Sequence, residues 1–533
     1  MQTLDLAILI GYFAVIFGIG GYFFRRARTS TAYFLADRSV GWVAVGASLF
    51  ASNISSEHFI GLAGSGASSG LAVGSFEWLA VFMCIVLGWV FVPFYLRSGV
   101  VTMPEFLERR YGPACRWYLT SISVIAYVVT KISVSLYAGA LVLRAVLGWD
   151  FYTSATVMVI ATGIYTVFGG LSAVIYTELV QAVVLIAGAV TLTAIGLSEA
   201  GGFAGLRAAL PPDFFHMIRP SSDPAFPWTG IFFGAPILGI WYWCTDQMIV
   251  QRVLGAKSEA HARAGAILCG ALKILPVFVL VLPGLIARAL YPTINGDDAY
   301  PTMVVKLLPS GLVGFMVAAL MAALMSSLAA TFNSASTLVT FDVYKALRPS
   351  AGEKQLVRVG RIVTVAMVAL SMLWVPFIKY LSTEVYIYLQ SVQAYISPPI
   401  AAVFLIGVFW PRANRYGAIA ALVAGAVLGA LRFIFELNKG SSLVSESPLL
   451  STLVGINFLH FAIVLFVVSV VLLVTVSLAT APESMAKLRG LTFATLDQAY
   501  RPRGRDARAI FTLQLVVTIV LAVFTIGLWV HFA

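Results

Sequence analysis

Long apolar runs alternate with short polar segments along almost the whole chain. A helix needs about 20 mostly apolar residues to cross the hydrocarbon core of a bilayer. Reading the apolar runs between charged or Pro/Gly-rich breaks predicts about fourteen such spans. The predicted spans are residues 4–24, 41–70, 74–96, 117–143, 153–170, 173–197, 229–250, 264–290, 311–340, 359–380, 384–410, 416–436, 455–480 and 510–532. The pattern indicates an all-α membrane protein in which residues 1–533 form a single transmembrane domain.

The first apolar run, residues 4–24, has no basic segment in front of it and ends in Arg25, Arg26 and Arg28. A cleavable signal peptide begins with a positive segment. We therefore expect this run to stay in the protein as a span.

Basic residues gather in alternate loops. With the N-terminus placed outside, most of the 34 Lys and Arg residues fall in inside loops, as is typical of cytoplasmic loops. Both termini then lie outside, and the chain is predicted to be a multi-pass protein of the cell (plasma or inner) membrane. The formal net charge of +11 belongs to the cytoplasmic face beside anionic lipid, so it requires no nucleic-acid partner.

The composition excludes several classes of protein. Charged residues make up 11% of the chain, against roughly 25% in soluble domains, and the mean hydropathy is +0.94. This excludes a soluble enzyme, a nucleic-acid binder and a disordered scaffold. The longest polar pieces, 198–228 and 481–508, are too short for a separate catalytic domain, and the sequence has no P-loop for ATP. The four cysteines show no metal-binding spacing and imply no disulfide framework.

The second predicted span carries polar residues that hydrocarbon does not tolerate. Its centre, residues 51–59, reads ASNISSEHF and is flanked by glycines. A discontinuous helix whose unwound backbone lines a cavity could hold these residues, as in many secondary transporters. Serine and asparagine also join buried helices through hydrogen bonds, which is the alternative. The presence of Glu57 and His58 together favours the cavity.

Two further charges lie in or beside spans. Lys273 lies too deep for an ordinary loop residue, and a buried cation needs a carboxylate partner. Glu77, at the start of the third span, is the natural candidate, although its position also suits an interfacial carboxylate. The alternative for Lys273 is a side chain that extends to the inner surface. For Lys131 and Glu178 the sequence favours structural pairs.

Three other polar groups fall within spans. Residues 241–247 read WYWCTDQ, an aromatic cluster that leads into an acid and an amide and could stack on a flat ligand. Ser326 and Ser327 suit a hard cation, which prefers oxygen ligands, although serines also pack helices. Gln390 and Gln393 precede Pro398 and Pro399, and their role is open from the sequence alone.

Several ordered motifs resemble the sodium/solute symporter family, and most of all its animal sodium/glucose cotransporter branch. They are SLFASNI at 48–54, GWVFVP at 88–93, VTMPE at 101–105, GGLSAVIYT at 169–177, WYWCTDQ at 241–247 and FNSASTL at 332–338. The resemblance covers nearly the whole chain. The compact length, without the animal proteins' cysteine-rich external loop and cytoplasmic insert, resembles bacterial members.

The resemblance implies a fold of two inverted five-helix repeats, here about 41–197 and 229–412, with the first helix of each repeat broken. One extra helix, residues 4–24, precedes the repeats, and three helices follow within 416–533. It implies transport of a hexose, glucose or galactose, into the cell with sodium as the co-transported ion, across a lipid bilayer. No oligomeric state is predicted.

The resemblance also implies roles for individual residues. Positions that bind sugar in this branch are Asn53, His58, Glu77, Tyr242, Trp243, Lys273 and Gln390. Positions that form hydrophobic gates are Leu62, Phe76 and Tyr386 on the outside and Tyr242, which also stacks on the sugar ring, on the inside. The sodium ligands are the backbone carbonyls of Ala51, Ile54 and Ala323 and the hydroxyls of Ser326 and Ser327.

Departures from the family pattern modify these expectations. Glu57 resembles the bacterial galactose transporters, whereas His58 follows the animal pattern. Gln393 stands in place of a threonine beside the sugar, and Gly239 in place of a hydroxyl residue. Ala329 replaces the threonine of two-sodium members, with Glu178 in place of the nearby aspartate. We therefore expect one sodium ion per sugar.

Three alternatives remain. The first is a symporter of the same fold for myo-inositol, another polyol or a different small solute. The second is a proton-coupled carrier in which Glu57 or His58 relays protons. The third is a membrane sensor or intramembrane enzyme, which would need an added soluble domain or a catalytic cluster that the sequence does not show.

Overall fold

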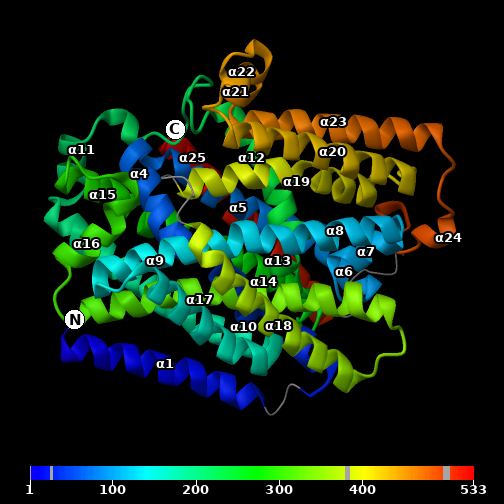
Figure 1. Ribbon diagram of the computed structural model, residues 1–533, viewed down its shortest axis with the longest axis horizontal. Coiled ribbons are helices and arrows are strands. Elements are labelled where there is room, and N and C mark those ends of the chain that lie inside the picture. Colours follow the sequence, from blue (N-terminus) through cyan, green and yellow to red (C-terminus); the bar gives the residue numbers. More distant parts are fainter. Residues whose placement is uncertain (1, 25–27, 379–384, 496–504) are drawn as a thin grey trace.

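The computed structural model describes residues 2–24, 28–378, 385–495 and 505–533, and within these ranges the chain is helical and forms no strand (Figure 1). Arg25, Arg26 and the ends of two predicted spans, at 379–380 and 384, lie outside the described residues. The all-α prediction is confirmed for the part of the chain that is described.

The first half of the chain forms eleven of the labelled α-helices. They are α1 (Thr3–Phe24), α2 (Ser30–Leu35), α3 (Trp42–Asn53), α4 (Ala63–Ser69), α5 (Ser75–Val86), α6 (Val92–Ser98), α7 (Met103–Arg110), α8 (Pro113–Ala126), α9 (Ser133–Leu147), α10 (Phe151–Glu199) and α11 (Gly202–Ala209). Single π-helical turns join α5 to α6 and α8 to α9, so that each pair forms one continuous helix.

The second half forms the rest. The helices are α12 (Ala235–Gly239), α13 (Gln247–Leu254), α14 (Glu259–Leu272), α15 (Leu282–Leu290), α16 (Ala299–Leu307), α17 (Leu312–Leu338), α18 (Glu353–Ile378), α19 (Val385–Phe409), α20 (Arg415–Leu437), α21 (Ser442–Ser445), α22 (Pro448–Gly455), α23 (Phe458–Ala479), α24 (Met485–Leu488) and α25 (Arg505–His531). A turn at Lys273 and Ile274 and then a π-helical segment, Val277–Val281, lead from α14 to α15.

Eleven helices within the described ranges are long and apolar enough to cross a membrane, which makes this a multi-pass membrane protein. One of them, α10, has 49 residues, well above the about 20 residues that one crossing of the hydrocarbon needs. Its backbone leaves helical geometry at Gly170, where φ is 59° and ψ is −159°. Glycine is required here because φ is positive and an added Cβ would lie 2.5 Å from the carbonyl oxygen of Tyr33.

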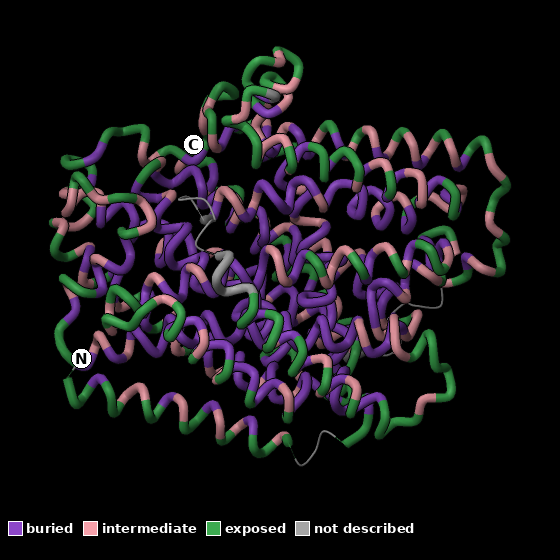
Figure 2. The backbone as a smooth tube through the Cα atoms, in the orientation of Figure 1, coloured by how far each residue is buried: buried purple, intermediate pink, exposed green. Residues whose placement is uncertain are grey.

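Burial separates inner helices from outer ones (Figure 2). The most apolar window of the helix that contains α17 is 83% buried, against 17% for α1 and 22% for α25. The outer helices expose large apolar side chains such as Leu513 and Val530, a surface that suits hydrocarbon and not water. Polar side chains therefore concentrate on the inner helices, where the candidate site lies.

The N-terminal helix α1 is fixed to the start of α17 by one buried carboxylate. Asp5 accepts hydrogen bonds from the backbone N–H groups of Gly311 and Gly314, at 2.7 and 2.8 Å. The first N–H groups of a helix have no partner within it, so Asp5 caps α17 from another helix. At Gly314 an added Cβ would lie 2.4 Å from the Cα of Asp5, so glycine permits the close approach.

We expect the substitution Asp5→Ala to lower the melting temperature of the detergent-solubilised protein, because loss of such a cap costs about 0.5–2 kcal/mol. A dye that fluoresces on reaction with thiols can follow unfolding, since Cys84, Cys115, Cys244 and Cys269 are all buried. Asp150→Ala is the matched control: Asp150 caps α10 through two N–H groups but is exposed. Equal shifts for the two variants would contradict a special role for Asp5.

Candidate functional site

The first helix break lies inside the bundle at Ile54 and Ser55. Helix α3 ends at Asn53, Ile54 has extended backbone angles, and the helix resumes with Ser56 and a π-helical turn from His58 to Leu62. The Ser55 hydroxyl accepts a hydrogen bond from the N–H of Glu57 at 3.3 Å. This side chain therefore bonds one of the free backbone N–H groups at the point where the helix resumes. The discontinuous helix predicted from the polar sequence is confirmed.

The second break lies at Asp246, between a π-helical segment, Ile240–Thr245, and α13. The Asp246 carboxylate caps α13 by accepting from the N–H of Met248 at 2.8 Å, and it also accepts from the Tyr127 hydroxyl at 2.5 Å. Hydrogen bonds from a neighbouring helix and from its own turn thus hold the interrupted backbone.

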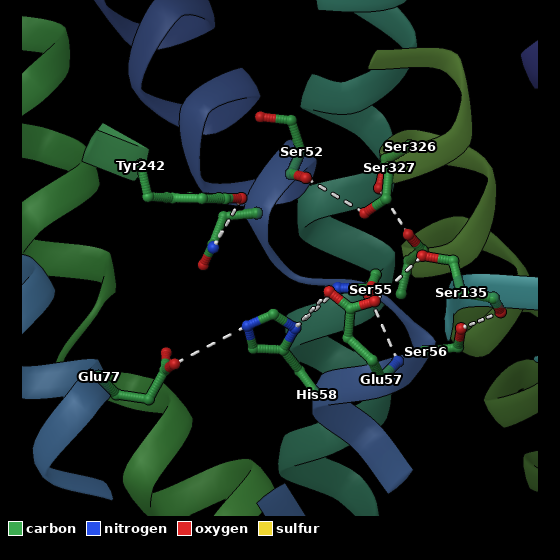
Figure 3. A network of polar contacts seen from close by, with 12 residues as sticks. Ser52, Ser55, Ser56, Glu57, His58, Glu77, Ser135, Tyr242, Ser326 and Ser327 are labelled. Carbon is green, nitrogen blue, oxygen red and sulfur yellow. Dashed lines mark hydrogen bonds and ion pairs between the residues drawn. The ribbon is translucent and has the colours of Figure 1, made fainter. Parts of the chain in front are cut away.

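Lys273 pairs with Glu77, as expected from the sequence. It lies just after α14, and its ammonium donates to the Glu77 carboxylate. The same ammonium also donates to Oδ1 of Asn53, at a distance of 2.5 Å. Lys273 and Glu77 are only 1% and 3% exposed, so neither charge reaches water. Nε2 of His58 lies 3.8 Å from the second Glu77 oxygen, which adds the broken helix to the same network (Figure 3).

Tyr242 meets this network from the second broken helix. Its hydroxyl accepts from Nδ2 of Asn53 at 3.0 Å, and its ring lies edge-on to Trp243 with centroids 5.3 Å apart. The Lys131 ammonium lies 3.7 Å from the Tyr242 ring centroid. The structural pair predicted for Lys131 is therefore wrong, since it forms no ion pair with any carboxylate in the described ranges.

One cavity joins most of the residues singled out in the sequence. It is lined by all seven predicted sugar positions, namely Asn53, His58, Glu77, Tyr242, Trp243, Lys273 and Gln390, and by the predicted gate residues Phe76 and Tyr386. Leu62 is fully buried but is not part of this lining. Lys131 lines the cavity although the sequence reasoning did not place it there; its position as an ionisable residue within a span was the available signal.

Aromatic side chains cover one side of the cavity. Tyr386 lies edge-on to His58 and to Phe76, with ring centroids 6.2 and 5.9 Å apart. Gly61 makes room for Tyr386, because a Cβ at this position would lie 2.7 Å from the Tyr386 Cβ. The predicted gate residues Phe76 and Tyr386 thus lie directly beside the polar network.

The lining also includes the two positions at which the sequence was expected to depart from the family pattern. Gln393 and Gly239 both face the cavity. A Cβ at Gly239 would lie 2.7 Å from Cγ of Met83, so the methionine side chain takes the space beside this glycine. A thioether and an amide therefore contribute to the lining at these two positions.

A cluster of oxygen atoms lies where α3 meets α17. The Ser326 hydroxyl is 2.8 Å from the carbonyl oxygens of both Ala51 and Ala323, and the Ser327 hydroxyl is 3.1 Å from the Ser52 carbonyl (Figure 3). Ile54 lies at the break, where its extended backbone turns away from the helix. Uncharged oxygens of this kind match the ligand preference of a hard monovalent or divalent cation.

A buried ion pair joins α10 and α13. Arg252 donates to Glu178 at 2.8 Å, and the Ser48 hydroxyl donates to the other carboxylate oxygen. Both charged side chains are fully buried. The structural pair predicted for Glu178 is confirmed, and a guanidinium is the cation that neutralises it.

Comparison with known proteins places the chain among transporters. The model of the "Sodium:solute symporter family" matches residues 33–425. Sodium/glucose cotransporter 1 of Oryctolagus cuniculus is 42% identical over 523 residues, which cover 90% of this chain and 79% of the relative. Sodium/glucose cotransporter 4 of Danio rerio is 42% identical over 535 residues, covering 93% of this chain and 81% of the relative. The predicted resemblance is confirmed.

A solved structure supports the fold. The outward-open, substrate-bound state of a Na+-coupled sialic acid symporter aligns with a TM-score of 0.76, covering 91% of this chain and 99% of that chain. The sequence identity is 22%, so the likeness concerns the fold alone.

We expect Lys273→Ala to destabilise the protein strongly, because removing one partner of a buried ion pair costs about 3–5 kcal/mol. The double variant Lys273→Ala/Glu77→Ala should lose less than the sum of the two single variants, as thermal melting can measure. The half-exposed pair of Lys487 and Glu483, 2.9 Å apart, is the matched control, and Lys487→Ala should cost at most about 1 kcal/mol. Strict additivity at Lys273 and Glu77 would contradict the coupling.

Proposed function

The chain belongs to the sodium:solute symporter family, and we propose that it carries a hexose, glucose or galactose, into the cell together with sodium by alternating access. The observation that carries this proposal is the buried polar cavity around Lys273, Glu77 and Asn53, directly beside the oxygen cluster at Ser326. Relatives named sodium/glucose cotransporters, 42% identical to this chain, give further support.

The cavity has the chemistry that a sugar requires. The Lys273 ammonium and the Asn53 and Gln390 amides can donate to sugar hydroxyls, and the Glu77 carboxylate can accept from them. His58 adds a ring nitrogen. Tyr242 and Trp243 offer aromatic faces for the apolar side of a pyranose ring. We assign these seven residues to sugar binding, with Leu62, Phe76 and Tyr386 as the outer gate and Tyr242 as the inner gate.

The sodium site is assigned to the cluster between α3 and α17. Its ligands are the carbonyls of Ala51, Ile54 and Ala323 and the hydroxyls of Ser326 and Ser327. An ion at this place joins the end of α3 to α17, so it stabilises one arrangement of these helices over another. A ligand shifts a conformational equilibrium only by its differential affinity for the two states, and sodium and sugar must then raise each other's affinity by the same factor.

We also propose the number of membrane spans and their division into two repeats. Fourteen spans result when α10 is counted as two spans that meet at Gly170 and the two broken helices, 42–69 and 230–254, are counted with the other long helices. The inverted repeats are then 41–197 and 229–412, and α3 and the helix with Asp246 begin them. Helix α1 precedes the repeats, and α20, α23 and α25 follow within 416–533.

Both termini are assigned to the outside of the cell membrane. Asp5 binds the start of α17, and the carbonyl of Phe532 accepts from the N–H of Met217 in the 198–228 segment. Both partners belong to segments that the distribution of basic residues places outside. The basic residues Arg501 and Arg503, assigned to the inside, lie outside the described residues.

The proposal is tested by uptake of labelled glucose and galactose into proteoliposomes with and without a sodium gradient. A pH gradient without sodium tests the proton-coupled alternative, and competition by myo-inositol and other polyols tests the alternative substrates. Sodium-dependent hexose uptake is the expected result. Uptake that follows the pH gradient alone would overturn the assignment of sodium.

We expect Ser327→Ala to raise the sodium concentration for half-maximal uptake by about tenfold, equivalent to about 1.4 kcal/mol, because the ion loses one oxygen ligand. Ser336→Ala is the control, since Ser336 is a buried serine of the same helix that donates to the Gly360 carbonyl at 2.7 Å. A normal sodium dependence in Ser327→Ala would mean that the ion binds elsewhere.

For the sugar, Gln390→Ala should raise the KM about three- to tenfold, as expected for one lost hydrogen bond, and should leave the sodium dependence close to normal in saturating sugar. Gln181→Ala, which alters a buried amide bonded to Tyr12, serves as control. Equal KM values for the Gln390 and Gln181 variants would remove Gln390 from the sugar site.

We expect one sodium ion per sugar. Ala329 supplies no hydroxyl for a second ion, and Arg252 already neutralises the nearby Glu178. Initial rates should therefore depend on sodium with a Hill coefficient of about 1, and charge and sugar fluxes should be equal. A measured ratio of two charges per sugar would contradict this stoichiometry.

A further inference from the structure

One helix carries three polar residues in a line that faces both helix breaks. Tyr127, Lys131 and Ser135 are spaced four residues apart in the continuous helix of α8, a π-helical turn at Tyr127–Ile132 and α9. Residues four apart lie on one face of a helix. All three are buried, so the line runs through the interior of the bundle.

Each end of the line forms hydrogen bonds with residues at one of the two helix breaks. Tyr127 donates to the Asp246 carboxylate at 2.5 Å and accepts from the N–H of Met248 at 3.2 Å. Ser135 donates to the Glu57 carboxylate at 3.1 Å, and its carbonyl accepts from the Ser56 hydroxyl at 2.7 Å (Figure 3). This helix is therefore a common support for both interrupted backbones.

Lys131 occupies the middle of the line and contacts Tyr242. Its ammonium lies 3.7 Å from the ring centroid. Along the same helix, Tyr127 bonds the Asp246 carboxylate and Ser135 bonds the Glu57 carboxylate. Lys131 and Tyr242 are 6% and 8% exposed, and a cation–π contact is strongest where both groups are desolvated. Tyr242 lies in the segment Ile240–Thr245, which leads directly into the break at Asp246 and then into α13.

We propose that Lys131 is a positioning residue that holds the Tyr242 ring against the sugar cavity and favours the closed arrangement of α13, the half-helix that follows the break at Asp246. The proposal rests on the proposed function, because it gives Tyr242 the role of inner gate. The ring is then held at two points, by Lys131 at its face and by Asn53 at its hydroxyl. Opening toward the inside must break the contact with Lys131, so the ammonium biases the equilibrium toward closure.

Lys131→Met removes the charge at nearly constant length, and Lys131→Arg keeps a cation that also stacks on aromatic rings. We expect Lys131→Met to raise the sugar KM about tenfold and to speed hydrogen exchange of residues 240–254 in lipid nanodiscs. Lys131→Arg should stay within about threefold of the wild type in both measurements. The control is Lys306→Met, because the Lys306 ammonium lies 4.5 Å from the Tyr291 ring centroid, outside the cavity lining.

Normal KM and exchange in Lys131→Met, or identical defects in the Met and Arg variants, would overturn the proposal. The exchange measurement needs no sugar, so it tests the contact even if the wild-type protein fails to transport hexose, an outcome that would instead overturn the proposed function. Should Lys131→Met not fold, Tyr242→Leu removes the same contact from the other side. It must also speed exchange of residues 240–254, and unchanged exchange in this variant would overturn the proposal.

Discussion

The burial of the Lys273 ammonium controls the rest of the site. A cation with 1% of its surface exposed is stable inside a membrane bundle only if a carboxylate and further acceptors surround it. Glu77 and Asn53 supply them from α5 and from the end of α3. The position of α3, and with it the break at Ile54 and Ser55, is therefore tied to α14 through a charge.

A broken helix is stable inside a membrane protein only where polar groups of the protein surround the break. Backbone groups released at a break find no water in hydrocarbon, so they must be buried against protein groups that bond them. At the first break the Ser55 hydroxyl accepts from the N–H of Glu57, and at the second break Asp246 and Tyr127 both accept from the N–H of Met248. The polar residues that look costly in the sequence are thus the residues that make the irregular backbone possible, and the cavity forms where they meet.

The sequence was informative where hydrophobic pattern and charge decide the structure. The apolar runs predicted the long helices, the polar segment 51–59 predicted the first break, and the isolated charge of Lys273 pointed to Glu77. The sequence could not show that Lys131 contacts an aromatic ring, because a cation inside a bundle can be satisfied by a carboxylate or by a π face, and only the packing of helices distant in sequence decides between them. Nor could it show that Arg252 is the partner of Glu178, 74 residues away.

The end of α3 explains how two different ligands can be coupled over a short distance. The carbonyl of Ala51 and the side chain of Asn53 are two residues apart, and the first faces the Ser326 hydroxyl while the second bonds Lys273 and Tyr242. In the proposed function, an ion that fixes the Ala51 carbonyl also fixes the backbone that carries Asn53. In this proposal sodium would prepare the sugar site by ordering its own ligands, and the coupling would need no long path of communication through the bundle.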